Sequence, residues 1–589
     1  MLTRFLLSLS FLLIPVICQA QLPNPDYYTL FQLTGGAGET RLIDSEGTVL
    51  HTWESNISAP SGTSAYLRED GLLLRAGQRG AVPPGAFLPG SWGTVQLVEM
   101  DGTVVWEYTQ QVVGELTFHH DLKPVGNGNI LVTVWEFLPV AEMVALGWQP
   151  VGGVNGVWME RIQELQPNLV DGSTTVVWEW ALENHLAQDA NAGAANFADV
   201  GAERGRVDVN FNAGIASGDY FHISGIDYNA ERDEIVLCPN NIDELWVIDH
   251  STTTAEAATS TGGARGQGGE LIYRWGNPQV YDFNNGSTQP GFLRRAHDPR
   301  WSVDPVSGEI QLTVHNNDQV DNTPGTADSQ VLLLDLPLNA SGDYVINNAE
   351  TFLPAAPVVL YERDPANPFF STPFMGGAQR LGNGNILITL ALSRTMVEVD
   401  QAGQIVWQES IANGGTFIFK AQNYSVSYSG FQDLPFAKPD LTTAETVSIL
   451  RGIAISGIDA DLDVSDDSDF VFQPGFTLDS TEPPVWLLVN TVIPANASQA
   501  TLQIEASANT PNINQVVDAF NFTTGQFEQV GEEAVSFNFD SVIDIDLDAS
   551  NHVQAGTGDV LNRVGYRTGG FTLVFPWSIA IDQVQWVSQ

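Results

Sequence analysis

The sequence is poor in cysteine, in basic residues and in long apolar runs, and each shortage excludes a class of protein. It has two cysteines, Cys18 and Cys238, of which Cys18 lies in a predicted leader. A single remaining thiol forms no internal disulfide, so folding depends on burial of an apolar core. Cys238 ends the apolar run "EIVLC", and we interpret it as a buried strand residue rather than a reactive thiol.

Basic residues are scarce relative to acidic ones. The chain contains 23 Lys and Arg against 70 Asp and Glu, which gives a formal charge of −47. Such a surface repels nucleic acid and anionic lipid, so we expect no nucleic-acid partner. An anionic substrate would need a locally positive pocket, because the overall field opposes its approach.

Apolar runs long enough to span a membrane are absent from the sequence. The longest begins at Phe5 and ends at Ile17, after Arg4 and before the small residue Ala20. It is too short to cross a hydrocarbon core of ~30 Å and has the features of a secretory signal. We therefore predict a signal peptide at 1–20 and an exported protein, periplasmic or extracellular, without membrane insertion.

Glycine and proline, by contrast, are abundant. The chain has 55 Gly and 31 Pro with 43% hydrophobic residues, a composition that favours an all-β architecture of short strands. The phrase "GNGNIL" occurs at Gly126–Leu131 and again at Gly382–Leu387. Asn-Gly between apolar runs predicts a tight hairpin, because both central residues of that turn need positive φ.

A second phrase, a turn glycine followed by β-formers and an aromatic residue, recurs along the same region. It stands around Gly47, Gly102, Gly172, Gly269 and Gly403, and more weakly around Gly342. Six units of this kind predict a six-bladed β-propeller over 21–436. Unrelated hairpins in a sandwich are the alternative.

The pattern changes after Phe436. We interpret 437–444 as a linker, and the alternating stretches beyond it, such as "QATLQIEAS", predict a β-sandwich over 445–589. The acidic run Asp459–Asp469 lacks the full spacing of a calcium loop. We interpret this run as a solvated turn and leave calcium binding open.

The nine histidines are the candidates for chemistry. They lack His-x-x-x-His and Glu-x-x-His spacing, so no compact metal site and no cofactor are predicted. A metal site built from histidines distant in the sequence is the alternative. Two histidines precede an aspartate: His120 before Asp121, and His297 before Asp298.

Five stretches resemble the bacterial arylsulfotransferases, which transfer sulfuryl groups without a nucleotide donor. In chain order they are "FHHDLKPVGNGNILV", "VVWEWALENHLAQ", "DYFHISGIDYNAERDEIVLCPNN", "GGELIYRWGNPQVYDF" and "RRAHDPRW". The resemblance covers most of 21–436. It implies a six-bladed propeller that moves a sulfuryl group from a phenolic sulfate ester to a phenol through a sulfohistidine. His297 matches the histidine that carries the group, and His222 and His120 match supporting histidines.

Histidine side chains can fill the roles that sulfuryl transfer requires. The reaction needs a neutral nucleophile, donors for three oxygens and an acid for the phenolate, and histidine with its pKa of ~6.5 supplies each role. We expect His222 and His120 to bind the sulfuryl oxygens or to shuttle the phenolic proton, and Asp298 to orient His297. The candidate substrate-binding residues are Asn240, Ser224, Asp121, Asp298 and His315.

Each histidine also has a structural interpretation. His120 could serve the hairpin through Asp121, His222 could be a hydrogen-bonded core residue, and the His297–Asp298 pair could lie at the surface. We interpret His119 as structural and His185 as part of a pocket wall. His51, His250 and His552 we interpret as incidental.

The sequence departs from the family pattern at three positions of the predicted pocket. The usual arginine eighteen residues after His222 is Asn240, the usual asparagine is Ser224, and the glutamine before the carrier histidine is Ala296. A neutral donor replaces a fixed cation at Asn240. The candidates for supplying that cation from elsewhere are Arg265, Arg294 and Arg295.

Two functions from different classes therefore stay open. The first is a working sulfotransferase with an altered anion site, whose partners are a small phenolic sulfate donor and a phenol acceptor. The second is a propeller that has lost the chemistry and binds an aromatic or glycan ligand. The natural substrates, the oligomeric state and the role of the carboxy-terminal domain are not predicted.

Overall fold

The protein is described by a computed structural model. It describes residues 27–35, 38–80, 88–150, 153–211, 218–281, 291–304, 308–318, 329–347, 351–362, 371–412, 417–431, 440–458, 462, 469–477, 482–495, 497, 499–538, 541–570 and 575–588. The predicted signal peptide at 1–20 and most of the acidic run 459–469 lie outside these residues.

The chain divides into two compact units, Met1–Ser425 and Val426–Gln589. Strands make up nearly all of the regular secondary structure in the described residues of both units, in agreement with the all-β prediction. The short helices are α1 (Val140–Ala145), α2 (Thr254–Ala257), α3 (Ala549–His552) and the 3-10 turns η1 (Leu182–His185), η2 (Asn240–Ile242), η3 (Pro278–Tyr281) and η4 (Ser429–Phe431). Over the described part of the chain, no helix is long and apolar enough to cross a membrane.

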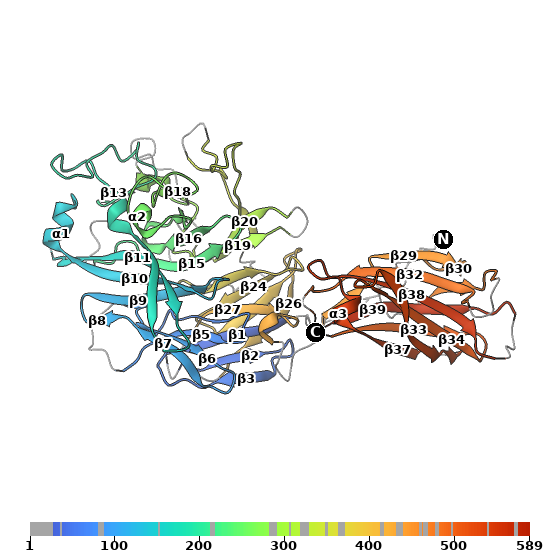
Figure 1. Cartoon of the computed structure of the whole chain (residues 1–589). Helices are drawn as coiled ribbons and strands as arrows, with labels where there is room; N and C mark the ends of the chain where they lie inside the picture. Colours follow the sequence, from blue (N-terminus) through green and yellow to red (C-terminus); the bar gives the residue numbers. More distant parts are fainter. Residues whose placement is uncertain are drawn as a thin grey trace, which may run out of the picture. The chain divides into compact units, whose positions relative to one another are not determined.

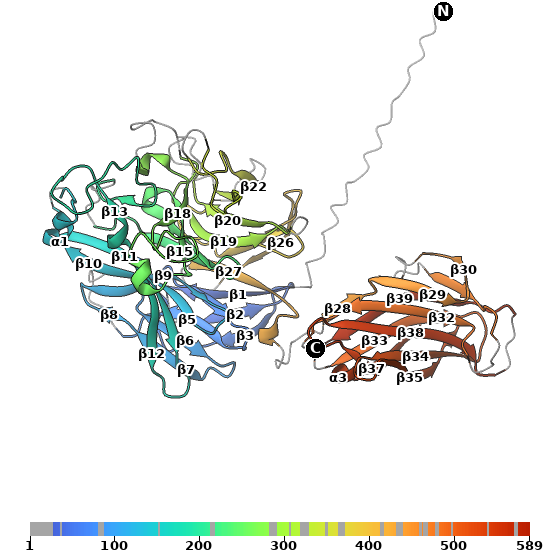
Figure 2. The ribbon, with the colours of Figure 1, turned by 45° about the horizontal axis from the view of Figure 1, so that its top comes forward.

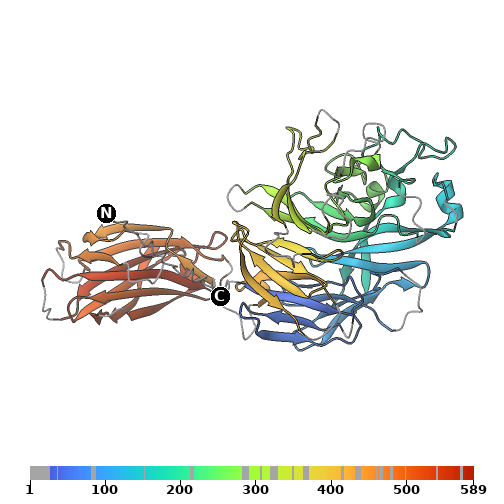
Figure 3. The ribbon, with the colours of Figure 1, turned by 180° about the vertical axis from the view of Figure 1, so that it is seen from behind.

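Six antiparallel sheets of four or five strands make up most of the described first unit (Figures 1 and 3). The first contains β27 (Phe417–Ser425), β1 (Tyr27–Thr34), β2 (Thr40–Ile43) and β3 (Val49–Trp53). The second contains β4 (Ala65–Leu67), β5 (Leu73–Gly77), β6 (Thr94–Val98) and β7 (Val104–Thr109). The third contains β8 (Gln111–Val112), β9 (Leu116–Pro124), β10 (Ile130–Pro139), β11 (Gly156–Pro167) and β12 (Thr174–Ala181).

The other three sheets follow in chain order. The fourth contains β15 (Ile223–Asn229), β16 (Glu234–Pro239), β17 (Leu245–Asp249) and β18 (Leu271–Trp275). The fifth contains β19 (His297–Val303), β20 (Ile310–Asn316), β21 (Gln330–Asp335) and β22 (Val358–Glu362). The sixth contains β23 (Gly377–Arg380), β24 (Ile386–Leu390), β25 (Thr395–Val399) and β26 (Ile405–Ser410). Between the third and fourth sheets, the sequence forms a small parallel pair, β13 (Leu186–Ala187) and β14 (Val207–Asp208).

The innermost strands of the six sheets form a closed ring. Neighbouring contacts run from β4 and β5 to β9, then to β15, β19, β23 and β27. The ring closes because β27, the last strand of the unit, pairs with β1, the first, which in turn contacts β4 (Figure 2). This arrangement is that of a β-propeller, in which closure removes the exposed edge between the first and last sheets.

The repeated sequence phrases have a structural reason. In each "GNGN" phrase the second glycine has positive φ, +89° at Gly128 and +83° at Gly384, but Asn127 and Asn383 do not. The hairpins are present, but the predicted turn with positive φ at both central residues is wrong, because a single left-handed glycine closes a longer turn. The recurring tryptophan on an outer strand donates its indole N–H to the following sheet or to the loop beside it. These bonds are Trp106 to Ser173, Trp178 to Thr252, Trp275 to Pro354 and Trp407 to Ser45. The phrase therefore marks where one sheet joins the next.

The second unit contains two sheets. One comprises β28 (Asp440–Thr443), β30 (Ile453–Ser456), β31 (Phe470–Gln473), β39 (Ile579–Ser588), β33 (Ala500–Ala508), β36 (Ser536–Phe537) and β37 (Ser541–Leu547). The other comprises β29 (Thr446–Arg451), β32 (Val485–Val492), β38 (Asp559–Thr568), β34 (Ile513–Asn521) and β35 (Gln526–Ala534). Alternate residues of β32 and β33 are buried, and both strands contribute to one apolar core.

The predicted linker at 437–444 is wrong in part. Residues 440–443 form β28, which pairs with β39 as an edge strand of the larger sheet. Backbone hydrogen bonds to an existing sheet edge hold this segment, so its order does not depend on an apolar sequence pattern.

Candidate active site

The three predicted catalytic histidines lie on or directly before neighbouring inner strands. His120 is on β9, His222 directly precedes β15, and His297 begins β19. The ring centroids of His120 and His222 are 4.2 Å apart with the planes at 70°. The ring of Phe419 on β27 lies 6.5 Å from that of His120 and 6.2 Å from that of His297. Side chains about a hundred residues apart in the sequence thus surround one aromatic ring.

Irregular backbone places two of these imidazoles. His120 and His222 have φ of 47° and 55°, and the ladder between β9 and β10 shifts register directly after His119. Left-handed φ is uncommon for a residue with a side chain, and such bulges re-aim side chains beside active sites. Gly90, whose carbonyl accepts from His120 N–H at 2.8 Å, allows the close approach: a Cβ there would stand 2.5 Å from His120 Nε2.

The tautomer of His297 is set by Asn317. The Asn317 amide nitrogen donates to the carbonyls of Thr372 (2.5 Å) and Met375 (2.6 Å), so its Oδ1 must face His297 Nδ1, 2.7 Å away. Nδ1 therefore carries the hydrogen, and Nε2 presents a lone pair that receives only a long contact, 3.3 Å, from Met375 N–H. Burial lowers the pKa of His297 to about 4, so the ring is a neutral nucleophile near neutral pH.

His222 is in the opposite state. Its Nδ1 lies 2.6 Å from Asp219 Oδ2. Burial by itself would lower the pKa of His222, but the charge and hydrogen bond of Asp219, with the charge of Glu160, raise it above its ordinary value. His222 therefore holds a proton more readily than His120 and His297 do.

His120 is held from the other side by His119 and Glu160. The Nδ1 atoms of His119 and His120 are 3.0 Å apart, and His119 Nε2 lies 3.0 Å from Glu160 Oε2. His119 stacks on Trp135 with centroids 4.0 Å apart and planes 2° from parallel. Burial, followed by the charges of its histidine neighbours, holds the pKa of His120 well below its ordinary value.

Asp121 and Asp298 were predicted to contact substrate. Their side chains point instead toward the middle of the ring of inner strands. Lys420 Nζ on β27 lies 2.7 Å from Asp121 Oδ2 and 3.0 Å from Asp298 Oδ1, and all three side chains are almost fully buried. Arg300 Nε also binds Asp298, at 2.7 Å. The predicted orienting role of Asp298 toward His297 is therefore wrong, because its oxygens pair with these cations and with the N–H of Ala378.

This axial network involves every inner strand. Ser64 on the loop before β4 donates to Asp121 at 2.8 Å, and Ile226 N–H on β15 donates to it at 3.1 Å. The same side of the ring holds Asp227 of β15, which pairs with Lys123 of β9 at 2.6 Å. Tyr66 of β4 lies under both lysines, 5.5 Å from Lys123 and 5.2 Å from Lys420. We define the axial network as Asp121, Asp227, Asp298, Lys123, Arg300 and Lys420, three charges of each sign.

Ser224 and Asn240, the other predicted pocket donors, serve mainly to hold the chain. Ser224 Oγ donates to Ala296 O at 2.9 Å and is fully buried, so the prediction that it binds substrate is wrong. Asn240 Nδ2 donates to the same carbonyl at 3.0 Å and lies 3.4 Å from His297 Nδ1. Asn240 therefore borders the histidine without reaching its Nε2 face.

His315 lies directly behind His297. The two are opposite each other in the β19–β20 ladder, and His315 is fully buried. Burial, with the nearby His297, lowers its pKa to about 3. Its Nε2 stands 3.1 Å from where a Cβ on Gly376 would lie, so its burial argues against the predicted contact with substrate.

Two of the three arginine candidates for a compensating cation, Arg265 and Arg294, are engaged elsewhere. Arg265 pairs with Glu234, and Arg294 pairs with Asp243 at 3.1 Å. Arg295 contributes a backbone contact, its carbonyl 2.9 Å from His297 Nδ1. Among the described contacts, His222 in its protonated form is the candidate cation beside His120.

The histidines interpreted as structural or incidental have fixed partners. His185 binds the carbonyl of Ala257 at 2.8 Å and stacks on Trp180. His250 lies 3.1 Å from Glu164 and 2.7 Å from Asp233, and thereby joins the third and fourth sheets. In the described residues no cluster of three or more His, Cys, Asp or Glu side chains is arranged to hold a metal ion.

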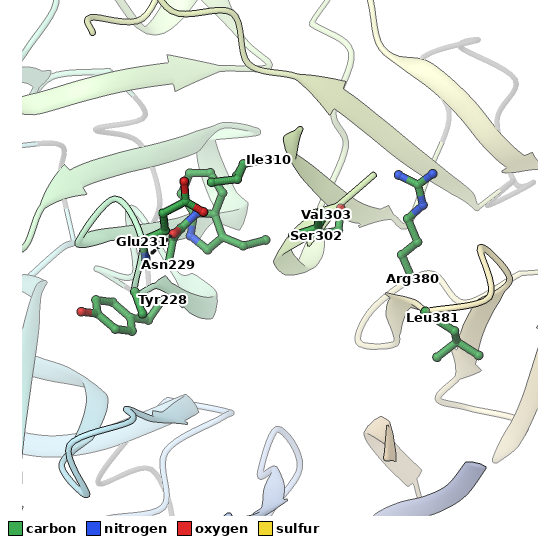
Figure 4. Close-up of a pocket in the computed structure, with 11 residues that line it drawn as sticks. Tyr228, Asn229, Glu231, Ser302, Val303, Ile310, Arg380 and Leu381 are labelled. Atoms are coloured by element: carbon green, nitrogen blue, oxygen red, sulfur yellow. Dashed lines mark hydrogen bonds between the residues drawn. The ribbon is translucent and has the colours of Figure 1, made fainter. Parts of the chain in front are cut away.

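A separate cavity lies at the opposite ends of the inner strands (Figure 4). Its volume is about 480 Å³, and residues near the carboxy-terminal ends of β15, β19 and β23 line it, among them Tyr228, Trp301 and Arg380. Arg380 points at Gln311 and at Asp304 Oδ2, 3.2 Å away. No sequence motif pointed to this cavity.

Comparison with known families agrees with this geometry. The family model described as Arylsulfotransferase (ASST) matches residues 87–414, a range that contains all three clustered histidines. The chain belongs to the arylsulfotransferase family. The activity that this membership supports is aryl sulfotransfer in general, with small aryl sulfates and phenols as substrates. A comparison with curated proteins found no significant match.

Solved structures resemble parts of the chain at low TM-scores. The β-propeller domain of Myceliophteria thermophila Cps50 (Swd1) is 12% identical over 66% of this chain and 83% of its own, with a TM-score of 0.32. A putative 6-phosphogluconolactonase from Bacteroides fragilis is 11% identical over 68% and 86%, also at 0.32. The CBM36-1 domain of a xylanase from a Trinervitermes trinervoides hindgut metagenome is 12% identical over 26% and 96%, at 0.16. With values this low, the fold assignment of this arylsulfotransferase rests on its own sheets.

Proposed function

We propose that this arylsulfotransferase moves a sulfuryl group from a phenolic sulfate ester to a phenol through a sulfohistidine at His297. Nε2 of His297 attacks sulfur, the bond from sulfur to the aryl oxygen breaks, and the departing phenolate takes a proton. In the second half-reaction a phenol oxygen attacks the same sulfur and loses its proton. The nitrogen–sulfur electron pair then returns to Nε2.

The observation that carries this proposal is the Asn317 amide, whose two donated hydrogen bonds force its oxygen toward His297 Nδ1. An imidazole held in this tautomer needs no deprotonation before it attacks. Its orienting partner is neutral, and a neutral partner suits a ring that must accept an electrophile.

The charge of the sulfuryl oxygens would be met by His222. Sulfuryl transfer resembles phosphoryl transfer, in which catalysis comes mainly from positioning and from charges fixed around the equatorial oxygens. The raised pKa of His222 favours its cationic form. We propose that this cation takes the place of the arginine that the family usually has at the position of Asn240.

We further propose that the six sheets of the first unit are six blades, and that the second unit is a β-sandwich whose two sheets enclose its apolar core. Export after removal of 1–20 remains part of the proposal, since the leader has the features of a secretory signal.

A second candidate function is ligand binding without chemistry. It is favoured by Asn240 and by the engagement of Arg265 and Arg294 with Glu234 and Asp243. This candidate predicts binding of aryl sulfates without turnover.

Incubation with 4-nitrophenyl sulfate and a phenol acceptor separates the two candidates. The transferase predicts release of 4-nitrophenol that depends on acceptor and is abolished in His297→Ala. His51→Gln, a substitution in the first sheet, serves as the control and should retain activity. Absence of turnover by the folded protein, together with saturable binding of the sulfate ester, would instead support the binding function.

A further inference from the structure

The pair formed by Glu160 and His119 lies on the far side of His120 and has no role in the reaction as proposed so far. Both side chains are fully buried. Glu160 Oε1 accepts from the indole of Trp135 at 3.1 Å and from Ile223 N–H at 3.0 Å, so its second oxygen is left for His119. Glu160 Oε2 lies 3.0 Å from His119 Nε2 without a hydrogen bond between the two atoms, so the two side chains interact through charge. The carboxylate therefore favours a positive charge on the His119 ring.

We propose that Glu160 and His119 store, behind His120, the proton that the two half-reactions exchange. The inference rests on the proposed function, because it concerns the phenolic proton of that reaction. Glu160 and His119 are positioning residues in this scheme, since neither would touch substrate. His120 would exchange the proton with the phenolic oxygen.

The contacts from Glu160 to His119 and from His119 to His120, together with the exchange between His120 and the phenolic oxygen, define a continuous path for the proton. When His119 is an imidazolium, its Nε2 lies 3.0 Å from Glu160 Oε2, and its Nδ1–H is donated to His120 Nδ1, also 3.0 Å away. His120 then carries its hydrogen on Nε2 and can donate it. When His119 is neutral, its Nδ1 accepts from His120 Nδ1–H, and His120 Nε2 becomes a base.

The proton balance of the cycle follows. In the first half-reaction the phenolate takes the hydrogen of His120 Nε2, and the hydrogen on His119 Nδ1 moves to His120 Nδ1. In the second, the acceptor phenol returns a proton to His120 Nε2, and the Nδ1 hydrogen moves back to His119. His120 stays neutral in both states and only changes tautomer. A low pKa of His120 is compatible with this role.

The groups that surround His119 differ in charge from those that surround His120, as the relay requires. His119 faces Glu160 from β11, the aromatic face of Trp135 from β10 and His120 on its own strand. His120 also faces the cation His222, which discourages a second positive charge on it. The relay therefore places the extra proton beside the Glu160 carboxylate and keeps it away from His222.

Dependence on the leaving group tests the relay. Phenolate is a stronger base than 4-nitrophenolate, so its departure depends more on a proton donor. In Glu160→Gln we expect the ratio of kcat/KM for 4-nitrophenyl sulfate to that for phenyl sulfate to rise about tenfold or more, within the range of general acid catalysis. A purely structural role of Glu160 would lower both values together and leave the ratio unchanged.

Glu164→Gln is the matched control. Glu164 is a buried carboxylate on the same strand that also faces a histidine, His250, and it lies away from the cluster. Its substitution should leave the ratio at the wild-type value. An unchanged ratio in Glu160→Gln, with His297→Ala inactive, would overturn the relay while the proposed function stands.

A second measurement does not require turnover. In protein labelled with ¹⁵N-histidine, the ring shifts of His119 and His120 report which nitrogens carry hydrogen, with His119→Gln and His120→Gln used for assignment. Glu160→Gln should lower the pH at which this pair loses its shared proton. An identical titration in wild type and Glu160→Gln would overturn the relay. If His297→Ala kept full activity, the proposed function and the relay would both fall.

Discussion

The histidine cluster and the axial network occupy adjacent residues of the same strands, yet they are built on opposite electrostatic principles. His120 precedes Asp121, His297 precedes Asp298, and Phe419 precedes Lys420. The first member of each pair faces the cluster, and the second enters the network. Successive side chains of a strand point to opposite sides, so one short motif can serve both regions.

The difference lies in how charge is balanced. In the axial network three carboxylates meet three cations, and the described ion pairs leave little charge to act on a ligand. In the cluster, three imidazoles are held in unequal protonation states by Asn317, Asp219 and the His119–Glu160 pair. The paired charges of the axial network hold the inner strands together, whereas the histidines of the cluster are available for sulfuryl transfer.

Removal of Lys420 should have the largest effect, and on stability. Lys420→Met leaves Asp121 and Asp298 buried beside one remaining cation, Arg300, so we expect the free energy of unfolding of the first unit to fall by about 3–5 kcal/mol. Denaturant titration measures it. Lys123→Met is the control, because Lys123 is 28% exposed and its loss should cost about 1 kcal/mol or less. Equal losses would remove the distinction between a buried and a peripheral lysine.

Asn317→Leu should affect activity more than stability. Without the amide oxygen, Nδ1 of His297 keeps only the carbonyl of Arg295, 2.9 Å away, so the reactive tautomer and the ring position are held more weakly. We expect kcat to fall about 10²-fold. Asn240→Leu should cost about tenfold or less, because its contact with Nδ1 is 3.4 Å. The reverse order of the two variants would contradict the assignment of the orienting residue.

Asp219→Asn should change the pH dependence of transfer. The folded pKa of His222 is raised, so its cationic form is lost as pH rises through that pKa. Removing the Asp219 charge lowers this pKa and moves the high-pH loss of activity to lower pH by about one unit or more. A pH profile of kcat/KM measures the shift. A profile identical to wild type would show that the cation lies elsewhere.

His250 provides the smallest expected effect and lies outside both regions. Burial opposes charge on His250, but Glu164 and Asp233 raise its pKa. Its contribution to stability is fully present below the unfolded pKa of ~6.5 and is lost as pH rises through the folded value. His250→Gln should therefore destabilise by on the order of 1 kcal/mol at pH 5 and by less at pH 9. Thermal unfolding at the two pH values measures this, and a pH-independent difference would contradict it.

The sequence allowed the all-β class, the repeated hairpins and the family to be predicted. Those features are local or follow from ordered motifs such as "FHHD" and "RRAHD". The orienting role given to Asp298 was wrong, because adjacency in a strand places a residue on the other side rather than within reach.

The residues missed are those that act across sheets. Asn317, Glu160 and Phe419 reach the cluster from β-strands or loops far away in the sequence. Two signals were available: Asp219 stands three residues before His222, and Lys420 is one of only three lysines in the chain. A rare lysine on a strand between apolar neighbours indicates a buried ionic role.

The central claim is that His297 receives the sulfuryl group, and a single-turnover experiment without acceptor tests it most directly. Protein mixed with excess 4-nitrophenyl sulfate should release about one equivalent of 4-nitrophenol, and the peptide containing His297 should gain the mass of one sulfuryl group. A folded His297→Ala variant should show neither. Release of 4-nitrophenol by that variant, or a sulfuryl group on another residue of the wild type, would contradict the account.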